Sequence, residues 1–322
     1  MSLKVAWIFP GQGSQKVGMG AELYQASAPA RAVFDRANEI LGFDLKGLCF
    51  HGPDDRLGMT QYTQPALYVT SMALWHAYRD RLPPPTFMAG HSLGELSALT
   101  AAGALSWETG LRVVQKRAQL MAAAPPGAMA AVLKFDSISV VEQVCAKLSG
   151  HGLVGIANYN SPAQVVVSGD AELIRAETTA VAFRSAGVKR YVVLAVSGAF
   201  HSPLMQRSAD EFLEFLRSIS FRDPQVPVIA NVTAQPYPDL ASIPVLLARQ
   251  LSAGVRWTES LALMHAEGVE TFLELGSGTV LTSLVKQNLS SAAAASIQAP
   301  ADVDAALALA RDPRAAHQEP IR

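Results

Sequence analysis

The sequence predicts an α/β protein: a hydrolase-like parallel-sheet large domain with an inserted ferredoxin-like (βαββαβ) small domain. Three observations lead to this prediction. Short apolar strands alternate with amphipathic helical segments in both outer parts of the 322-residue chain, as in parallel sheets covered by helices. The middle part instead runs strand, helix, strand, strand, helix, strand. Half of the residues are apolar and 16% are charged, which excludes disorder for most of the chain.

The elements of the outer parts follow from this periodicity. The first part has an apolar strand at 5–9, a helical pattern over 20–41 and a helix over 64–81 that is entered through Pro65. A strand at 86–89 runs directly into a helix over 93–102. After residue 200 the alternation resumes, with helices at 204–219, 243–251 and up to about 288, and strands at 228–230 and 272–275.

The middle part predicts strands at 128–135, 153–158, 164–168 and 190–196, with helices at 138–148 and 171–186. Pro125-Pro126-Gly127 marks its start, and Ser197-Gly198 marks its end. We therefore expect a large catalytic domain from 1–126 and 198–300 and an inserted domain from 127–197. Residues 313–322 are predicted to form a loose C-terminal tail.

Composition excludes several classes of protein. A net charge of −1 argues against nucleic-acid binding. No run of about 18 apolar residues predicts a membrane helix, and the alanine-rich run at 292–295 is too short to span anything. The only cysteines, Cys49 and Cys145, make neither a disulfide framework nor a zinc site, so a cytoplasmic location is expected.

The sequence Gly90-His91-Ser92-Leu93-Gly94 matches the G-x-S-x-G nucleophile elbow. A predicted strand precedes it and a predicted helix follows it, which is the context that this turn needs. Glycines flank the serine because side chains there would clash. The Ser92 hydroxyl then projects from the sheet, and the backbone N–H of Leu93 can stabilise an oxyanion.

A serine nucleophile needs a base, and His201 is the candidate among seven histidines. His201 follows a predicted strand, where sites in α/β sheets gather. His91 adjoins Ser92, so its ring is expected to point away from the hydroxyl. The glycine-rich turn 11–15 is no dinucleotide or phosphate loop, because Lys16 stands where a glycine is required and no Gly-Lys-Ser/Thr follows. It can instead supply a second oxyanion N–H or be an ordinary turn.

The chain at this point resembles the malonyl-CoA:acyl-carrier-protein transacylases, including the acyltransferase domains of polyketide synthases. The resemblance covers roughly residues 4–290. Six motifs carry it in order: Gly11-Gln12-Gly13-Ser14-Gln15, Thr63-Gln64-Pro65-Ala66-Leu67, Gly90-His91-Ser92-Leu93-Gly94-Glu95, Ala199-Phe200-His201, Gln250-Leu251 with Val255-Arg256-Trp257, and Glu274-Leu275-Gly276.

The resemblance implies a role for each matching residue. Ser92 is similar to the acylated nucleophile and His201 to its base, which a backbone carbonyl near Gln250 orients in place of a triad acid. The N–H groups of Gln12 and Leu93 match the oxyanion hole. Other matching positions bind substrate: Arg117, Gln64, Gln250, Asn160 and Phe200.

Arg117 matches the arginine that holds the free carboxylate of the substrate. A guanidinium binds a carboxylate through two parallel hydrogen bonds and stays charged when buried. The alternative is a solvated arginine in a basic patch with Lys116. The resemblance implies that Phe200, in Ala-Phe-His, favours malonyl over methylmalonyl groups, and core packing is the alternative role for Phe200. Ala118 departs from the family glycine and is expected to tighten the pocket edge.

A second departure is Ala253-Gly254, which replaces a proline-containing stretch and is expected to loosen the loop near Gln250. The resemblance implies a ping-pong transfer of malonyl from coenzyme A, through a serine ester, to the phosphopantetheine thiol of a holo acyl carrier protein. No bound cofactor or metal is implied, and a coenzyme A thioester is the substrate. The substrate is expected in the cleft between the domains. Basic residues that could meet an acidic carrier protein are Lys189, Arg190, Arg184 and Arg207.

Three alternatives remain open from the sequence. One is an acylhydrolase that edits carrier-protein thioesters, which the carboxylate-binding Arg117 disfavours. Another is a trans-acting polyketide-synthase acyltransferase that uses another acyl group or a specialised carrier. The third is a non-catalytic docking module, which the combination of Ser92, His201 and Arg117 disfavours. The sequence does not distinguish fatty acid from polyketide synthesis.

Overall fold

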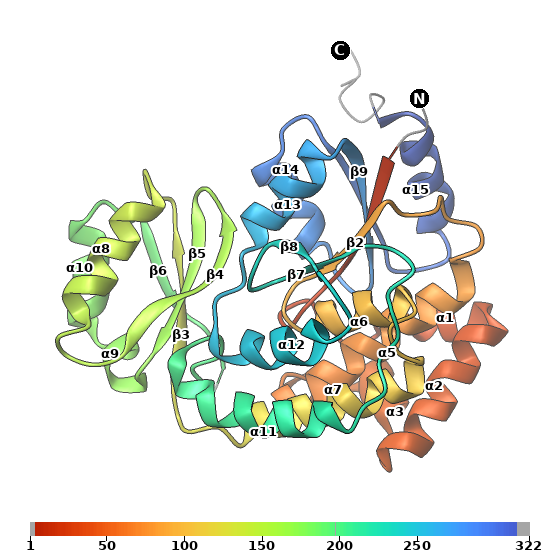
Figure 1. Ribbon diagram of the computed structural model, residues 1–322, viewed down its shortest axis with the longest axis horizontal. Coiled ribbons are helices and arrows are strands. Elements are labelled where there is room, and N and C mark those ends of the chain that lie inside the picture. The colour runs from red at the N-terminus through yellow and green to blue at the C-terminus, as the bar shows by residue number, and fades with distance from the viewer. Residues whose placement is uncertain (1–3, 197, 314–322) are drawn as a thin grey trace.

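Two sheets of different topology form the protein, as the sequence predicts (Figure 1). The computed structural model describes residues 4–196 and 198–313. One sheet has six strands in the order β10-β9-β1-β2-β7-β8, and every neighbouring pair is parallel except β7 and β8. Its strands are β1 (Lys4–Phe9), β2 (Phe87–Gly90), β7 (Val228–Ala230), β8 (Gln235–Pro236), β9 (Val269–Leu275) and β10 (Ala293–Ile297).

Helices cover both faces of this sheet. The central strand β1 is buried on both sides, with Trp7 and Phe9 in one apolar cluster and Ala6 and Ile8 in another. Such strands read as continuous apolar runs because neither face meets water. The helices are α1 (Ala21–Ala26), α2 (Ala28–Leu41), α3 (Leu45–His51), α4 (Asp54–Leu57), α5 (Thr60–Tyr78), α6 (Gly94–Ala101), α7 (Trp107–Ala122), α11 (Gln206–Arg217), α12 (Ser242–Ser252), α13 (Trp257–Ala266), α14 (Val280–Asn288) and α15 (Asp302–Arg311).

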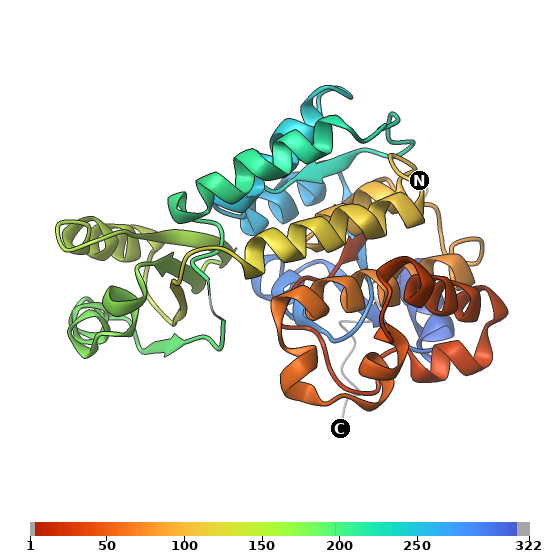
Figure 2. The same ribbon diagram turned by 90° about the horizontal axis from the view of Figure 1, so that it is seen from below.

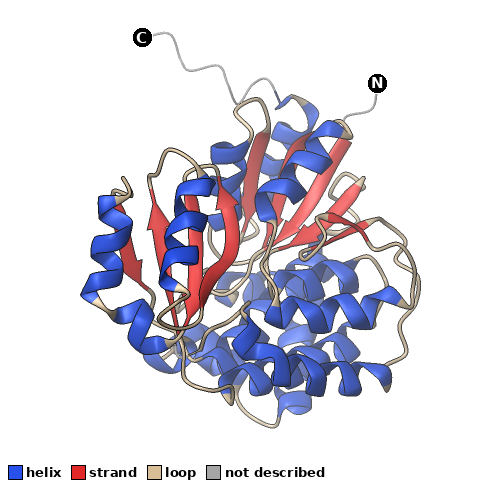
Figure 3. Ribbon diagram, turned by 60° about the vertical axis from the view of Figure 1, so that its left-hand side comes forward, coloured by secondary structure: helices blue, strands red, loops and turns tan. Residues whose placement is uncertain are grey.

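The second sheet is antiparallel, with the order β4-β5-β3-β6, and stands to one side of the large unit (Figure 1). Its helices lie on the face that points away from the large unit, as Figure 3 shows from another side. This order and the βαββαβ connection are those of a ferredoxin-like fold. The elements are β3 (Ala128–Leu133), α8 (Ile138–Leu148), β4 (Val154–Ser161), β5 (Gln164–Gly169), α9 (Ala171–Arg175), α10 (Glu177–Ser185) and β6 (Arg190–Val193).

The chain enters and leaves this second unit at one point. Pro126 and Gly198 form an antiparallel bridge, so the two connecting strands run side by side. A second link joins β4 to the large unit, where Asn158 pairs with Val255. The predicted domain limits of 127 and 197 remain predictions.

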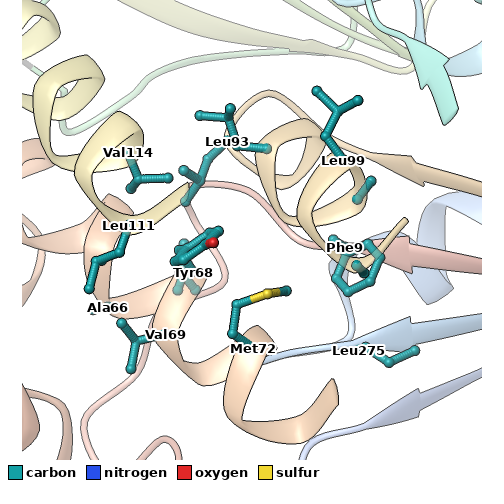
Figure 4. Packing of buried hydrophobic residues seen from close by; sticks show 14 of the residues in the cluster. Phe9, Ala66, Tyr68, Val69, Met72, Leu93, Leu99, Leu111, Val114 and Leu275 are labelled. Carbon is teal, nitrogen blue, oxygen red and sulfur yellow. The ribbon is translucent and has the colours of Figure 1, made fainter. Parts of the chain in front are cut away.

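Helix α5 forms the centre of the largest apolar cluster (Figure 4). Its Tyr68 is fully buried, and the hydroxyl donates to Trp107 O at 2.9 Å and lies 3.1 Å from Thr100 Oγ1. Gly110 of α7 permits this contact, because a Cβ there would lie 2.1 Å from the Tyr68 hydroxyl. Figure 2 shows α7 and α11 as two long helices that run toward the inserted unit. The fold therefore fixes α7, which carries Arg117, against α5.

Several elements differ from the sequence prediction. The range 20–41 forms two helices because Ser27 caps α2 through Ala30 N, and the range 171–186 is likewise divided at Ala176. Helix α5 begins at Thr60, so Pro65 lies inside it rather than at its entrance. The alanine-rich run is strand β10, which pairs with β9. The predicted tail lies, from residue 314 on, outside the described residues.

Six further elements were not predicted from the sequence, although α7 and α15 are amphipathic: α3, α4, α7, α13, α15 and β8. Strand β6 ends at Val193, three residues early, and a short 3₁₀ turn at Pro203–Met205 precedes α11. Across 4–196 and 198–313, the structure has no helix of the length and apolarity that a membrane crossing requires.

A substitution tests how tightly the strand-to-helix turn is packed. In Gly90→Ala the new Cβ would lie 1.9 Å from the Gly94 carbonyl atoms. We expect the free energy of unfolding to fall by about 3 kcal/mol, measured by urea unfolding. Gly155→Ala is the matched control, since it is also a strand glycine and nothing lies within 4 Å of its added Cβ. Equal stability of the two variants would contradict this packing.

Candidate active site

Ser92 lies on the sharp turn between β2 and α6. Its φ is 52°, in the left-handed region that non-glycine residues rarely adopt. The turn is tight because α6 begins at Gly94, and a Cβ on Gly94 would lie 2.0 Å from Phe9 O of β1. Both glycines of the motif are therefore required by close backbone approach. The turn presents Ser92, half-buried, at the carboxyl end of the parallel sheet.

Asn231 holds this turn in place, and the sequence analysis missed it. Its Oδ1 accepts the backbone N–H of Ser92 at 2.8 Å, and its Nδ2 donates to Gly90 O at 2.7 Å. The residue is buried and directly follows β7, the strand beside β2. A polar residue at the carboxyl end of a strand was the signal that could have identified it.

Ser92 and His201 are brought together as the sequence analysis expected. Ser92 Oγ lies 2.8 Å from His201 Nε2, and His201 Nδ1 lies 2.7 Å from the backbone oxygen of Gln250. A carbonyl oxygen can only accept, so Nδ1 carries the hydrogen and Nε2 is free to accept a proton. His201 also has a positive φ, 58°. The pair has the geometry of a nucleophile and its base.

Burial first, and after it the positive charge of Arg117, lower the pKa of His201 to about 3. The imidazole is therefore neutral at physiological pH in the empty site. A neutral imidazole is the form that can take the proton of Ser92.

Arg117 is buried, 1% exposed, and points at the nucleophile. Its Nη2 donates to Ser92 Oγ at 3.0 Å and to Gln250 Oε1 at 2.7 Å, and its Nη1 donates to Gln64 Oε1 at 2.7 Å. The alternative of a solvated surface arginine is therefore wrong. Burial lowers the pKa of Arg117 to about 10, so the guanidinium is still charged at neutral pH. Neutral amides hold this charge, and they are weaker partners than a carboxylate.

A cavity of about 170 Å³ opens beside these residues. Residues of the large unit and of the inserted unit line it, as expected for a cleft between the two. Gln12 and Leu93 line the cavity, and among the described residues no acceptor is found for the backbone N–H of either. Other predicted site residues also line it: Gln64, Asn160, Phe200 and Arg117. Gln250, which was also expected to bind substrate, does not line the cavity, and instead bonds to Arg117 and His201, which do.

His91 also lines the cavity, where its ring packs edge-on against Trp257. Its Nε2 lies 2.8 Å from Asn160 Oδ1. The ring thus bonds to the Asn160 amide, and the structural role expected for His91 stays a prediction. Within the described part of the chain, no group of three or more His, Cys, Asp or Glu side chains is placed to hold a metal ion.

The two departures from the family pattern have less effect than expected. Ala118 is buried outside the cavity lining, so it does not form the pocket edge. The stretch after Gln250 is not loosened, because Val255 N donates to Ala157 O at 2.8 Å and Val255 O accepts from Tyr159 N at 2.9 Å. A Cβ on Gly254 would lie 3.1 Å from Ile156 O, so the loop lies close against β4.

A parallel sheet that carries an elbow serine beside a histidine defines the chain as a hydrolase-like α/β protein. Comparison with known proteins narrows this class. The family model described as the acyl transferase domain matches residues 6–314. The chain belongs to this family, among the malonyl CoA-acyl carrier protein transacylases.

Three similar proteins illustrate the relationship. The chain is 48% identical to the polyketide biosynthesis protein ThaF of Burkholderia thailandensis over 90% of its own length, and it spans 25% of that protein. It is 44% identical to the malonyl CoA-acyl carrier protein transacylase of Bacillus subtilis, over 88% of this chain and 90% of that one. It is also similar, with a TM-score of 0.90 and 38% identity over 95% and 99% of the two chains, to PlMCAT, a malonyl-transacylase solved in complex with the type II PKS acyl-carrier protein AntF.

The position of Arg117 predicts a shift in pH dependence. In Arg117→Ala the pKa of His201 rises, because a positive charge that disfavoured the imidazolium is gone. The rate at which a fluorophosphonate labels Ser92 falls at acid pH, and the midpoint of this fall should therefore move to higher pH by about 1 unit. Arg112→Ala, on the exposed side of the same helix, is the control. An unmoved midpoint in Arg117→Ala would show that Arg117 does not act on the base.

Proposed function

We propose that this chain transfers a malonyl group from coenzyme A to the thiol of a holo acyl carrier protein. The observation that carries the proposal is the buried guanidinium of Arg117, 3.0 Å from Ser92 Oγ. An acyl group attached to Ser92 that ends in a carboxylate would reach this guanidinium. An acyl group without a carboxylate would leave the guanidinium with neutral hydrogen-bond partners alone, which hold a buried charge less strongly than a carboxylate does.

The first half of the reaction forms a serine ester. His201 Nε2 takes the Ser92 proton while Oγ attacks the thioester carbonyl carbon. The N–H groups of Gln12 and Leu93 stabilise the oxyanion, a contribution of about 3 kcal/mol per donor in other enzymes. The imidazolium then returns its proton to the coenzyme A sulfur as the C–S bond breaks.

The second half repeats these steps with a different thiol. The phosphopantetheine thiol gives its proton to His201 and attacks the malonyl ester, and Ser92 Oγ recovers the proton as it leaves. Hydrolysis competes with this step unless water is kept away from the ester. The apolar cavity wall, which includes Phe200, Met121 and Leu194, favours transfer over hydrolysis.

The malonyl carboxylate also affects the base. In the empty site the charge of Arg117 lowers the pKa of His201. A bound carboxylate neutralises that charge, so the pKa of His201 rises when a dicarboxylic acyl group is present. Contact between malonyl and Arg117 therefore has two effects: the guanidinium holds the acyl group, and the neutralised charge makes His201 a stronger base.

The partners follow from this chemistry and from the relatives. The solved complex of PlMCAT with AntF supports a carrier protein as the acceptor. Of the basic residues that the sequence suggested for docking, Arg184 pairs with Glu177 and Arg207 lies 3.1 Å from Glu211. Lys189 and Arg190, at the start of β6, remain the candidates to meet an acidic carrier protein.

No protein-bound cofactor takes part in the proposed reaction, and coenzyme A enters only as the leaving group of the substrate. Relatives named for polyketide biosynthesis, such as PksC of Bacillus subtilis, stand beside relatives named without a pathway. We assign the chain to acyl-group supply for fatty acid or polyketide synthesis on this basis. Two free, buried cysteines are typical of the reducing cytoplasm that we propose as its location.

Intact-protein mass spectrometry tests the proposal. The enzyme is mixed with malonyl-CoA, acetyl-CoA or methylmalonyl-CoA, and a holo carrier protein is then added. We expect a malonyl adduct that persists in water and moves to the carrier, and no adduct in Ser92→Ala. Free malonate and coenzyme A without an adduct would indicate an acylhydrolase. An adduct only with another acyl group would indicate a different transferase.

The role of Arg117 has its own test. In Arg117→Ala, transfer of malonyl should fall by about 100-fold or more, because a charge-assisted bidentate contact worth about 3 kcal/mol is lost. Transfer of acetyl should change far less. Initial rates with both donors measure the ratio, and Arg112→Ala again serves as the control. Equal losses for malonyl and acetyl would mean that Arg117 has only a structural role.

A further inference from the structure

Glu95 is a fully buried carboxyl group that the proposed reaction does not use. It lies in the first turn of α6, three residues after Ser92. Its Oε1 accepts from the Tyr237 hydroxyl, and its Oε2 accepts from Gln250 Nε2 and from Asn231 N at 3.2 Å. Buried acids that bond to site residues commonly have a function.

Gln250 connects Glu95 to the reacting groups. Its Nε2 donates to Glu95 and to Ser92 O at 2.9 Å, while its Oε1 accepts from Arg117 at 2.7 Å. Its backbone oxygen accepts from His201. Because the ionised carboxylate can only accept, it fixes the orientation of the amide. A flipped amide would direct its NH₂ group at the guanidinium.

The buried charges of Glu95 and Arg117 no longer balance once a malonyl carboxylate binds. Arg117 forms no ion pair with any described carboxylate, and Glu95 is the acidic group that interacts with its charge, across the amide of Gln250. In the empty site, one buried carboxylate thus accompanies one buried guanidinium. A malonyl carboxylate adds a second negative charge for the same cation.

We propose that Glu95 is a positioning residue and the resident counter-charge of Arg117, and that it takes up one proton when the carboxylate of an acyl group binds. This inference rests on the proposed function, because it needs an acyl group with a free carboxylate. The proton can sit on Oε1, since the Tyr237 hydroxyl can turn from donor to acceptor. Gln250 keeps its contact with Oε2, so the site keeps its geometry.

The overall reaction balances with this proton. The thioester C–S bond breaks and the ester bond to Ser92 Oγ forms. The Ser92 proton passes through His201 to the coenzyme A sulfur, and one further proton comes from solvent to Glu95. Tyr237, whose hydroxyl bonds to Glu95, is partly exposed as a residue. Loading of malonyl therefore consumes one proton wherever Glu95 is ionised in the empty enzyme.

The surroundings of Glu95 support this behaviour. Burial raises its pKa to about 7, whereas Tyr237, Gln250, Asn231 and Arg117 all act to lower it. Of the elements packed on α6, α7 contributes the charge of Arg117, which is already among these causes. β2 and β7 carry no ionisable side chain, the Tyr68 hydroxyl of α5 bonds to Thr100 and Trp107, and Lys4 of β1 bonds to Glu267 O. Two further ionisable neighbours are His201, which bonds to the Gln250 backbone, and His91, which bonds to Asn160.

The pH dependence of loading tests the proposal. The equilibrium between malonyl-CoA with free enzyme and malonyl-enzyme with coenzyme A is measured by intact mass from pH 6 to pH 9. Above pH 7, near the pKa of Glu95, the loading constant of the wild-type protein should fall by up to about tenfold per pH unit, because loading consumes a proton. Glu95→Gln, which mimics the protonated form, should show no such fall. Ionisation of the released coenzyme A thiol changes the loading constant equally for every variant, so it does not affect the comparison between them.

Two further variants keep the test decisive. Tyr237→Phe removes a donor that stabilises the ionised form, so the fall should begin at higher pH, whether or not Glu95→Gln folds. Glu274→Gln changes another buried acid, held by Leu281 and Thr282 at the start of α14, and should keep the wild-type slope. Equal slopes in wild type, Glu95→Gln and Tyr237→Phe would overturn the inference alone. Absence of a malonyl adduct at every pH would instead overturn the proposed function.

Discussion

The hydrogen bonds of Gln250 are the interaction on which the rest of the site depends. Its backbone oxygen sets the tautomer of His201, and its side chain joins Arg117 to Glu95. One residue near the end of α12 thus controls the base, the cation and the buried acid together. Any movement of this residue changes proton transfer and substrate binding at once. A triad acid is unnecessary here, because a carbonyl oxygen is enough to orient the imidazole.

Burial gives these few groups their strength. Arg117, His201 and Glu95 are all removed from water, so their charges act on one another with little screening. For this reason the guanidinium of Arg117 lowers the pKa of His201, and the neutral amides of Gln64 and Gln250 can hold the guanidinium in place. The parallel sheet makes this possible, since adjacent strands β2 and β7 deliver Ser92 and Asn231 to the same buried edge. The large unit alone cannot close the cavity, and residues of the inserted sheet complete its wall.

Features that depend on local sequence could be predicted, and features that depend on distant contacts could not. The elbow at Ser92 is specified by glycines within a few residues, and the βαββαβ order is visible in periodicity. Strand β10 was missed because alanines carry little strand preference, and pairing with β9 decides its conformation. Asn231 and Tyr237 reach the site from 139 and more residues away. Asn231 has one local signal, its place directly after β7, whereas no local pattern marks Tyr237. The resemblance identified Gln250 as a site residue, but only the three-dimensional structure shows that its amide bonds to Arg117 on one side and to Glu95 on the other.

The bridge between Pro126 and Gly198 has a consequence for how such proteins diversify. An insert whose two ends lie side by side can be exchanged without any change in the topology of the sheet that carries it, and such an insert is called a cassette. Ser92, His201 and Arg117 all belong to the large unit, whereas Asn160 and Val166 on the cavity wall belong to the cassette. Exchange of cassettes between relatives would therefore leave the chemistry in place and change which acyl chains and thiol arms the cavity admits.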